Sequence, residues 1–255
     1  MHDTLLKVNN LSFSYGNKQV LHGLSCSIER GQTYTLLGRN GSGKTTFFKC
    51  MLKQNQIDSD SVYLEGTDIT KISIAHYSKL VSYVPQLISQ ENRDISTRDY
   101  LVQGRSPYLK TFGVPKKEDY LASLHYARMV GIEDVIGSSL NELSGGKLQL
   151  ICITRALIQE TPLIIMDEPL SALDIPNQLK ILSVIEELEK LGKTIIFSSH
   201  NPNHAIHLHS KILLMKNGEM KTGDCQSLIN QETLSDAYEC DISVNNIDGQ
   251  LSVSF

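Results

Sequence analysis

The sequence predicts an α/β fold with a parallel sheet, and two patterns lead to that prediction. The first is a compact apolar strand at Thr33–Leu37 that runs directly into the glycine-rich segment GRNGSGKT, residues 38–45. The second is a succession of strand, amphipathic helix and strand at 163–166, 178–191 and 194–198. Such a succession is the crossover unit that joins parallel strands of one sheet.

The remaining elements follow in chain order. Residues 1–30 alternate polar and apolar positions and are interrupted by glycines, which is typical of short antiparallel strands. From Thr45 onward, TTFFKCMLK predicts a helix that begins at the glycine-rich loop. Residues of about 88–160 lack strand-like runs and carry helical spacing, so we expect a mostly helical subdomain inserted into the α/β framework.

The C-terminal part predicts strands again. Lys211–Met215 is apolar, and Asn217-Gly218 after it is typical of a tight turn. Residues of about 225–255 are expected to form a short extension of the domain. Its tail, 241–255, alternates around Asn245-Asn246 and Asp248-Gly249, which indicates a terminal hairpin.

Composition excludes some classes of function. The net charge of -4 argues against a general nucleic-acid binder, which would normally carry a basic excess. The five cysteines are scattered without a CxxC pair, which fits reduced thiols better than disulfides or a zinc site. We expect no signal peptide, and the apolar runs are far shorter than the roughly 20 residues that cross a bilayer. Any action at a membrane would therefore go through a partner.

The glycine-rich segment satisfies the pattern G-x-x-x-x-G-K-[ST] of a phosphate-binding P-loop. Its glycines let backbone N–H groups wrap around phosphates, Lys44 should reach the β- and γ-phosphates, and the Thr45 hydroxyl should hold Mg²⁺. A chance glycine-rich turn is the alternative, and the strand before and the helix after the segment argue against it. The loop residues expected to bind ATP are Gly38, Arg39, Asn40, Gly41, Ser42, Gly43, Lys44, Thr45 and Thr46.

Two acids follow the apolar run 163–166. A buried strand that delivers a carboxylate at its C-terminal end is where α/β sheets place ligands. We therefore expect Asp167 to lie on the Mg²⁺ side, and Glu168 to orient and deprotonate the attacking water.

Further motifs resemble those of the ATP-binding cassette (ABC) ATPases. The signature motif, normally LSGGQ, is matched by Leu143-Ser144-Gly145-Gly146-Lys147, and the D-loop by Ser171-Ala172-Leu173-Asp174. Gln86 matches the glutamine of the Q-loop, His200 the switch histidine, and Tyr15 the aromatic residue that stacks on adenine. The resemblance spans residues 4–223. It implies a P-loop NTPase core with a parallel sheet, an N-terminal antiparallel β-subdomain and an inserted α-helical subdomain, together forming a single domain over residues 1–255.

The resemblance also implies the roles of these residues. Glu168, His200 and Lys44 would be catalytic, and Thr45, Gln86 and Asp167 would hold the Mg²⁺ that accompanies ATP. The signature motif heads a helix and would act on ATP held by a second copy of the chain. We therefore expect an ATP-dependent homodimer.

Lys147 departs from the family pattern, which has glutamine there. A cation at the start of a helix opposes the helix dipole at a cost of about 0.3–1 kcal/mol when exposed. Near a triphosphate the same cation could add attraction. We interpret Lys147 as a tolerated substitution, because Ser144 and Gly146 are kept.

Several histidines follow the strand at 194–198, and His200 with His204 has the i, i+4 spacing of a metal-binding pair. The switch role of His200 and the presence of Pro202, which argues against a continuous helix from 200, both disfavour a metal site.

Three segments narrow the resemblance to ATPases of iron-siderophore, haem and cobalamin importers. They are Arg98–Tyr108, which resembles a GR-x-P stretch, His200–Ala205, which resembles HDPNHA with Asn201 for aspartate, and Leu234–Tyr238. The implied partners are integral-membrane permease subunits and, indirectly, an extracytoplasmic substrate-binding protein, with no nucleic acid. The implied location is the cytoplasmic face of the inner membrane.

Other functions stay open at this point. An oxyanion importer for molybdate or tungstate, or an exporter, could use a closely similar ATPase. A soluble ABC ATPase would usually carry two cassettes or a long coiled-coil insertion. A module that only binds ATP would be expected to have lost Glu168, Lys44 or His200, and all three are present.

Overall fold

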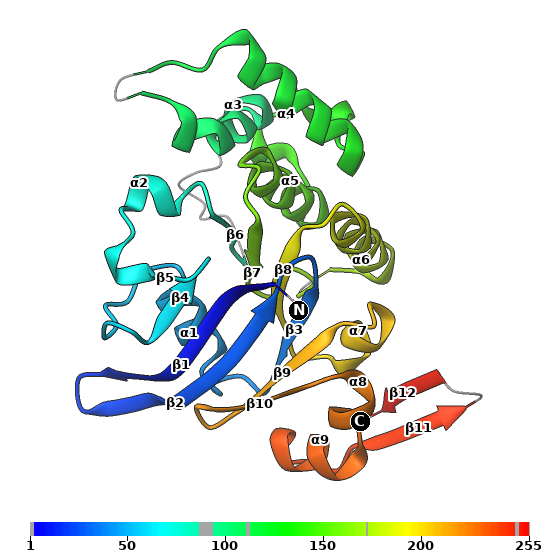
Figure 1. Ribbon diagram of the computed structural model, residues 1–255. Helices are drawn as coiled ribbons and strands as arrows, with labels where there is room; N and C mark the ends of the chain where they lie inside the picture. Colours follow the sequence, from blue (N-terminus) through cyan, green and yellow to red (C-terminus); the bar gives the residue numbers. More distant parts are fainter. Residues whose placement is uncertain (1–2, 87–93, 111–112, 172, 248–249, 255) are drawn as a thin grey trace. The chain divides into compact units, whose positions relative to one another are not determined.

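A computed structural model describes residues 3–86, 94–110, 113–171, 173–247 and 250–254 (Figure 1). The chain divides into two compact units. The first joins Met1–Ser73 to Ile185–Phe255, and the second is Ile74–Val184. The bounds of about 88–160 for a helical subdomain stay a prediction.

The first unit begins with an antiparallel sheet. Strands β1 (Thr4–Tyr15) and β2 (Lys18–Glu29) pair along their length, and β4 (Val62–Leu64) and β5 (Thr67–Asp68) continue the sheet in the order β2-β1-β4-β5. The strands end at the expected break, Gly16-Asn17, and at 12 residues each they are longer than the short strands expected. Shifts of register between Thr4 and Ser14 interrupt the pairing without ending β1.

Parallel strands position the glycine-rich loop in the same unit. The fully buried β3 (Thr33–Leu37) pairs in parallel with β8 (Thr194–Ser199) on one side and β9 (Lys211–Lys216) on the other. Strand β10 (Glu219–Gly223) returns antiparallel to β9. Asn217 and Gly218 both have positive φ, which is what a tight two-residue turn of this kind requires. Helix α1 (Lys44–Met51) follows the loop, and α7 (Pro202–His207) follows β8.

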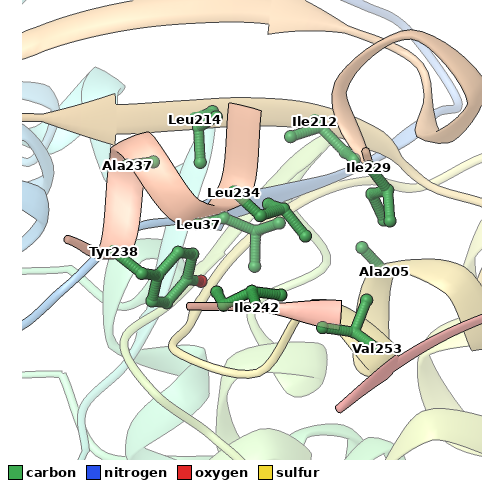
Figure 2. Packing of buried hydrophobic residues seen from close by; sticks show 10 residues of the cluster. All are labelled: Leu37, Ala205, Ile212, Leu214, Ile229, Leu234, Ala237, Tyr238, Ile242 and Val253. Atoms are coloured by element: carbon green, nitrogen blue, oxygen red, sulfur yellow. The ribbon is translucent and has the colours of Figure 1, made fainter. Parts of the chain in front are cut away.

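The C-terminal extension comprises helices α8 (Cys225–Leu228) and α9 (Gln231–Tyr238) and the hairpin of β11 (Ser243–Ile247) and β12 (Gln250–Ser254). The predicted hairpin is confirmed by its antiparallel register, although its expected turn at Asp248-Gly249 lies outside the described residues. Side chains of α9 and of the tail pack with β3 and β9 in one apolar cluster (Figure 2). The cluster comprises Leu37, Ala205, Ile212, Leu214, Ile229, Leu234, Ala237, Tyr238, Ile242 and Val253.

The second unit contains a pair of parallel strands, β6 (Val81–Val84) and β7 (Leu163–Met166). The segment expected to be helical contains α3 (Thr97–Val102), α4 (Lys117–Val130) and α5 (Gly145–Ile158) in its described part. Short turns of 3-10 helix lie at Ile69–Lys71, in the first unit, and at Gln103–Tyr108, Glu133–Val135 and Leu140–Glu142. Helix α2 (Ile74–Tyr77) opens the unit.

Two helices begin earlier than expected. Helix α1 begins at Lys44, one residue before the predicted start. Helix α6 (Ile175–Lys190) begins three residues before the expected 178, because the Asp174 side chain accepts a hydrogen bond from the Asn177 backbone and supports an earlier first turn. Within the described part of the chain, every helix is too short or too polar to span a membrane.

Candidate functional site

The glycine-rich loop takes a backbone conformation that only glycine adopts readily. Gly38, Gly41 and Gly43 all have positive φ, at 149°, 83° and 112°. A side chain at Gly38 would collide with the carbonyl oxygen of Met215. Gly43 is the N-cap of α1 and has no side chain with which to cap the first turn of the helix. Backbone N–H groups at the start of a helix can bind an anion, so this loop has the backbone chemistry of an anion site.

Lys44 lies inside this loop. Its side chain is buried, and its Nζ donates to the carbonyl oxygens of Gly38 at 2.7 Å and Arg39 at 3.0 Å. The following Thr45 is exposed and Thr46 is half-buried. Within the loop Ser42 is buried, whereas Arg39, Asn40 and Gly41 are exposed. The lysine is therefore held in place by the same peptide units that begin the loop.

His200 lies at the same edge of the parallel strands. It is exposed and directly follows β8, which pairs with β3 so that Ser199 is opposite Leu37, the residue before the loop. Parallel neighbours end at one edge of a sheet, so the strand ends bring the predicted switch histidine beside the glycine-rich loop.

Tyr15, at the end of β1, is 48% exposed. Its ring forms a T-shaped pair with Phe13 at a centroid distance of 4.9 Å, and its hydroxyl accepts a hydrogen bond from Asn55. A half-exposed aromatic ring held by such contacts offers a surface on which a flat base can stack.

The second histidine of the i, i+4 pair has a structural contact. His204 is buried, and its Nδ1 lies 2.9 Å from the Ser199 hydroxyl. Burial lowers the pKa of His204 to about 4, and the charges of His200 and His207 add to the effect. Among the described residues, no group of three or more His, Cys, Asp or Glu side chains is arranged to hold a metal ion.

The acidic motif lies in the second unit. Asp167 is buried at the end of β7, and its backbone N–H donates to Val84. Glu168 has φ of 46°, in the left-handed region that a glutamate rarely adopts. Burial raises the pKa of the nearby Tyr83 to about 12, and the Asp167 carboxylate adds to this.

Three of the predicted motifs meet around Glu168. The exposed Gln86 donates through Nε2 to Glu168 Oε2 at 3.1 Å and to the Ser171 hydroxyl at 3.3 Å. The Ser171 hydroxyl in turn donates to the backbone carbonyl of Glu168 at 2.9 Å. The Q-loop glutamine and the first D-loop residue therefore hold both ends of the glutamate.

The signature motif begins helix α5 in the second unit. Ser144 is the N-cap, and its side chain makes no capping hydrogen bond. Ser144 and Gly145 are exposed, whereas Gly146 is buried and Leu143 is half-buried. The start of the helix is thus accessible, with a hydroxyl and backbone N–H groups that could bind an anion.

Asn177 links the signature motif to the D-loop, a contact that the sequence analysis missed. Its amide packs against Gly146, where a Cβ would lie 2.6 Å from Asn177 Nδ2. The same amide donates to the Asp174 carboxylate at 2.6 Å. Asp174 is exposed and Leu173 is half-buried, while Ala172 lies outside the described residues. The D-x-x-N pattern formed by Asp174 and Asn177 is typical of the start of a helix, and it could have indicated that these two side chains are in contact.

Lys147 has a partner that the sequence did not reveal. Its Nζ lies 2.7 Å from the Asp134 carboxylate. The hydrogen bond and charge of Lys147 lower the pKa of Asp134. The carboxylate offsets the unfavourable position of a cation near the start of α5.

Comparison with known proteins shows the family of this chain. The model of the ABC transporter family matches residues 21–171. An uncharacterized ABC transporter ATP-binding protein of Haemophilus influenzae is 35% identical over 92% of this chain and 89% of its own length. The petrobactin import ATP-binding protein of Bacillus subtilis is 32% identical over 96% of this chain and 97% of its own. A solved transporter described as of the metal-chelate type superposes with a TM-score of 0.85 at 27% identity, covering 99% and 96% of the two chains.

Proposed function

The chain belongs to the ABC transporter family of ATP-binding proteins, which hydrolyse ATP, and from this we propose that it powers an importer of iron-siderophores or similar metal chelates. The observation that carries the proposal is the similarity to the petrobactin import protein, because it covers nearly the whole of both chains. Haem and cobalamin belong to the same proposed class of cargo.

ATP binding is assigned to the loop 38–46 of the first unit. The backbone N–H groups at the start of α1 bind the phosphates, and Lys44 neutralises their charge. The contacts of Lys44 with two carbonyls of the loop support this, because phosphate oxygens would compete well for the same ammonium group. Tyr15 stacks on the base, and its exposed ring supports that role.

The family generally uses ATP with Mg²⁺, and we assign the metal to Thr45, Gln86 and Asp167. Hydroxyl, amide and carboxylate oxygens are the ligands that Mg²⁺ prefers. The exposure of Thr45 and Gln86 leaves their oxygens accessible, which fits this donor set. When bound, Mg²⁺ neutralises charge on the phosphates.

Glu168 is assigned as the base that orients and deprotonates the attacking water. Its strained backbone and its hydrogen bond from Gln86 support the role, since both fix the direction of the carboxylate. His200 is assigned to hydrogen-bond the γ-phosphate and so distinguish ATP from ADP.

The exposed start of α5 is assigned to ATP held by a second copy of the chain, so that two copies close on two nucleotides. Importer ATPase subunits work with membrane permease components. We extend this to permease subunits at the cytoplasmic face of the inner membrane and to an extracytoplasmic substrate-binding protein that delivers the ligand.

Uptake of radioactive iron bound to a siderophore tests the proposal. In cells that lack the chromosomal gene, the wild-type chain should restore uptake, and Glu168→Gln should not. Glu187→Gln, which changes an exposed glutamate of α6, is the matched control and should restore uptake. If deletion abolishes uptake of molybdate and leaves uptake of iron chelates unchanged, the chain serves an oxyanion importer and the proposal is wrong.

A further inference from the structure

The end of helix α9 contacts the first residues of the P-loop. The Glu239 carboxylate, directly after the helix, forms an ion pair with the Arg39 guanidinium. The preceding Tyr238 is buried, and burial raises the pKa of its hydroxyl while the Gly38 backbone lowers it. Two consecutive residues of the C-terminal extension therefore meet two consecutive residues of the loop.

Packing brings these residues together. Leu37, the last residue of β3 and the residue before the loop, belongs to the same apolar cluster as Leu234 and Tyr238 of α9. Figure 2 shows their side chains gathered beneath the helix, with the Tyr238 ring near Ile242. Movement of α9 would therefore disturb the strand end from which the loop departs.

The same two loop residues, Gly38 and Arg39, also contact Lys44 through their carbonyl groups. The ammonium group of Lys44 donates to both carbonyl oxygens. Glu239 holds the Arg39 side chain, and the Tyr238 hydroxyl lies near enough to the Gly38 backbone for that backbone to lower its pKa. Gly38 has no room for a side chain. The start of the loop is thus fixed between the phosphate-binding lysine and α9.

The C-terminal extension also has anchors away from the loop. Lys216 of β9 pairs with Asp236 at 2.6 Å. Asn203 of α7 exchanges two hydrogen bonds with the Val253 backbone, each of 2.9 Å, which ties the terminal hairpin to the helix after His200. These contacts hold the extension to the unit without contacting the loop.

We propose that Tyr238 and Glu239 are positioning residues for ATP binding, which fix the Gly38–Arg39 segment and through it the ammonium group of Lys44. The inference rests on the proposed phosphate-binding role of the loop. Neither residue contacts the reacting atoms, so their loss should weaken ATP binding and leave the chemical step almost unchanged.

The test measures KM and kcat for ATP in the full-length chain carrying Tyr238→Phe or Glu239→Gln. Each variant should raise KM about two- to fivefold, the size expected for one hydrogen bond or one exposed ion pair, with kcat within about twofold. Tyr238→Phe alters no charge at neutral pH, so a change in KM would come from the position of the Gly38–Arg39 segment and not from a change in electrostatic repulsion of ATP. Glu239 is half-exposed, so Glu239→Gln keeps the test available if Tyr238→Phe fails to fold.

Asp236→Asn is the matched control, because it removes an ion pair of α9 that does not contact the loop. It should leave KM within about 1.5-fold of wild type. The proposal is overturned if Tyr238→Phe, Glu239→Gln and Asp236→Asn all have the same KM for ATP. It is also overturned if Glu239→Gln lowers this KM, because the carboxylate would then act only by repelling phosphate. A wild-type chain that does not bind ATP would instead contradict the proposed function.

Discussion

At the scale of single residues, Glu168 combines chemical and conformational signs of function. Its left-handed backbone costs about 1 kcal/mol or more, and such strain persists where surrounding contacts impose it. Here Gln86 holds the carboxylate and Ser171 holds the carbonyl.

Glu168→Gln should lower the ATP turnover number about a hundredfold or more, because the amide cannot accept the proton of the attacking water. ATP binding should persist, since the phosphate-binding loop is unchanged. Steady-state hydrolysis and equilibrium binding of ATP measure the two effects. Turnover within about threefold of wild type would exclude Glu168 as the base.

Lys147→Gln should keep ATP turnover within about tenfold of wild type, a difference in barrier of about 1.4 kcal/mol. The reason is that Asp134 already neutralises Lys147, so the glutamine of the family pattern restores little. Turnover assays on Lys147→Gln and on Asp134→Asn check this. An increase above tenfold in Lys147→Gln would show that the lysine inhibits the reaction.

His204 should make the protein less stable in acid. In the unfolded chain the His204 imidazole becomes protonated as the pH falls below its ordinary pKa of about 6.5. In the folded protein it becomes protonated only as the pH falls to about 4. The free energy of unfolding contributed by His204 should therefore fall by about 2 kcal/mol from about pH 7 to about pH 5. Urea unfolding of His204→Asn should lack this part of the slope.

His209→Asn, at an exposed histidine of the same segment, is the control and should keep the wild-type slope. Equal slopes in wild type and His204→Asn would contradict a depressed pKa for His204.

At the scale of elements, the sequence predicted best where local pattern and tertiary packing agree. Strands β3 and β7 lie at the residues expected, because short apolar runs bounded by loop residues are buried on both faces. The predicted start of α6 was three residues too late, because the Asp174 side chain caps the helix by accepting a hydrogen bond from the Asn177 backbone. This cap lets the helix begin before its apolar pattern does. Strand β1 ends at the expected break, Gly16-Asn17, and is longer than the short strand expected because its register shifts do not end it.

The contact between Asn177 and Gly146 should couple α6 to the start of α5. Gly146→Ala places a methyl group against an amide that Asp174 holds, so it should destabilise the protein by about 1 kcal/mol or more in wild type and less when Asn177 is alanine. Urea unfolding of the two single variants and the double variant measures the coupling.

Gly145→Ala is the control for this cycle, because a methyl group there meets open space. It should be neutral or slightly stabilising through helix propensity. Additive effects of Gly146→Ala and Asn177→Ala would show that the two residues are not coupled.

At the scale of the whole molecule, the sequence identified the family, and it proposed the residues of the candidate site, whose roles stay predictions. It did not reveal the contacts between distant segments. The motifs of the P-loop, acidic strand and signature are local, so each could be predicted from its own residues. Arg39 and Glu239 are separated by 200 positions and pair only because α9 packs on β3 and β9. No periodicity or spacing encodes such a contact.

Under the proposed function, each copy of the chain supplies a P-loop for its own ATP and a signature motif for the ATP of another copy. Hydrolysis by an isolated copy would then be slow, and association by mass action would raise it. Glu168→Gln provides the inactive reference at every concentration.

The most direct test is the specific ATPase activity of the purified chain as a function of its own concentration, at saturating ATP and Mg²⁺. We predict that activity per molecule rises with protein concentration and levels off when the chain is dimeric. A specific activity that stays constant from the lowest concentration upward, in protein that remains monomeric with ATP, would contradict the account.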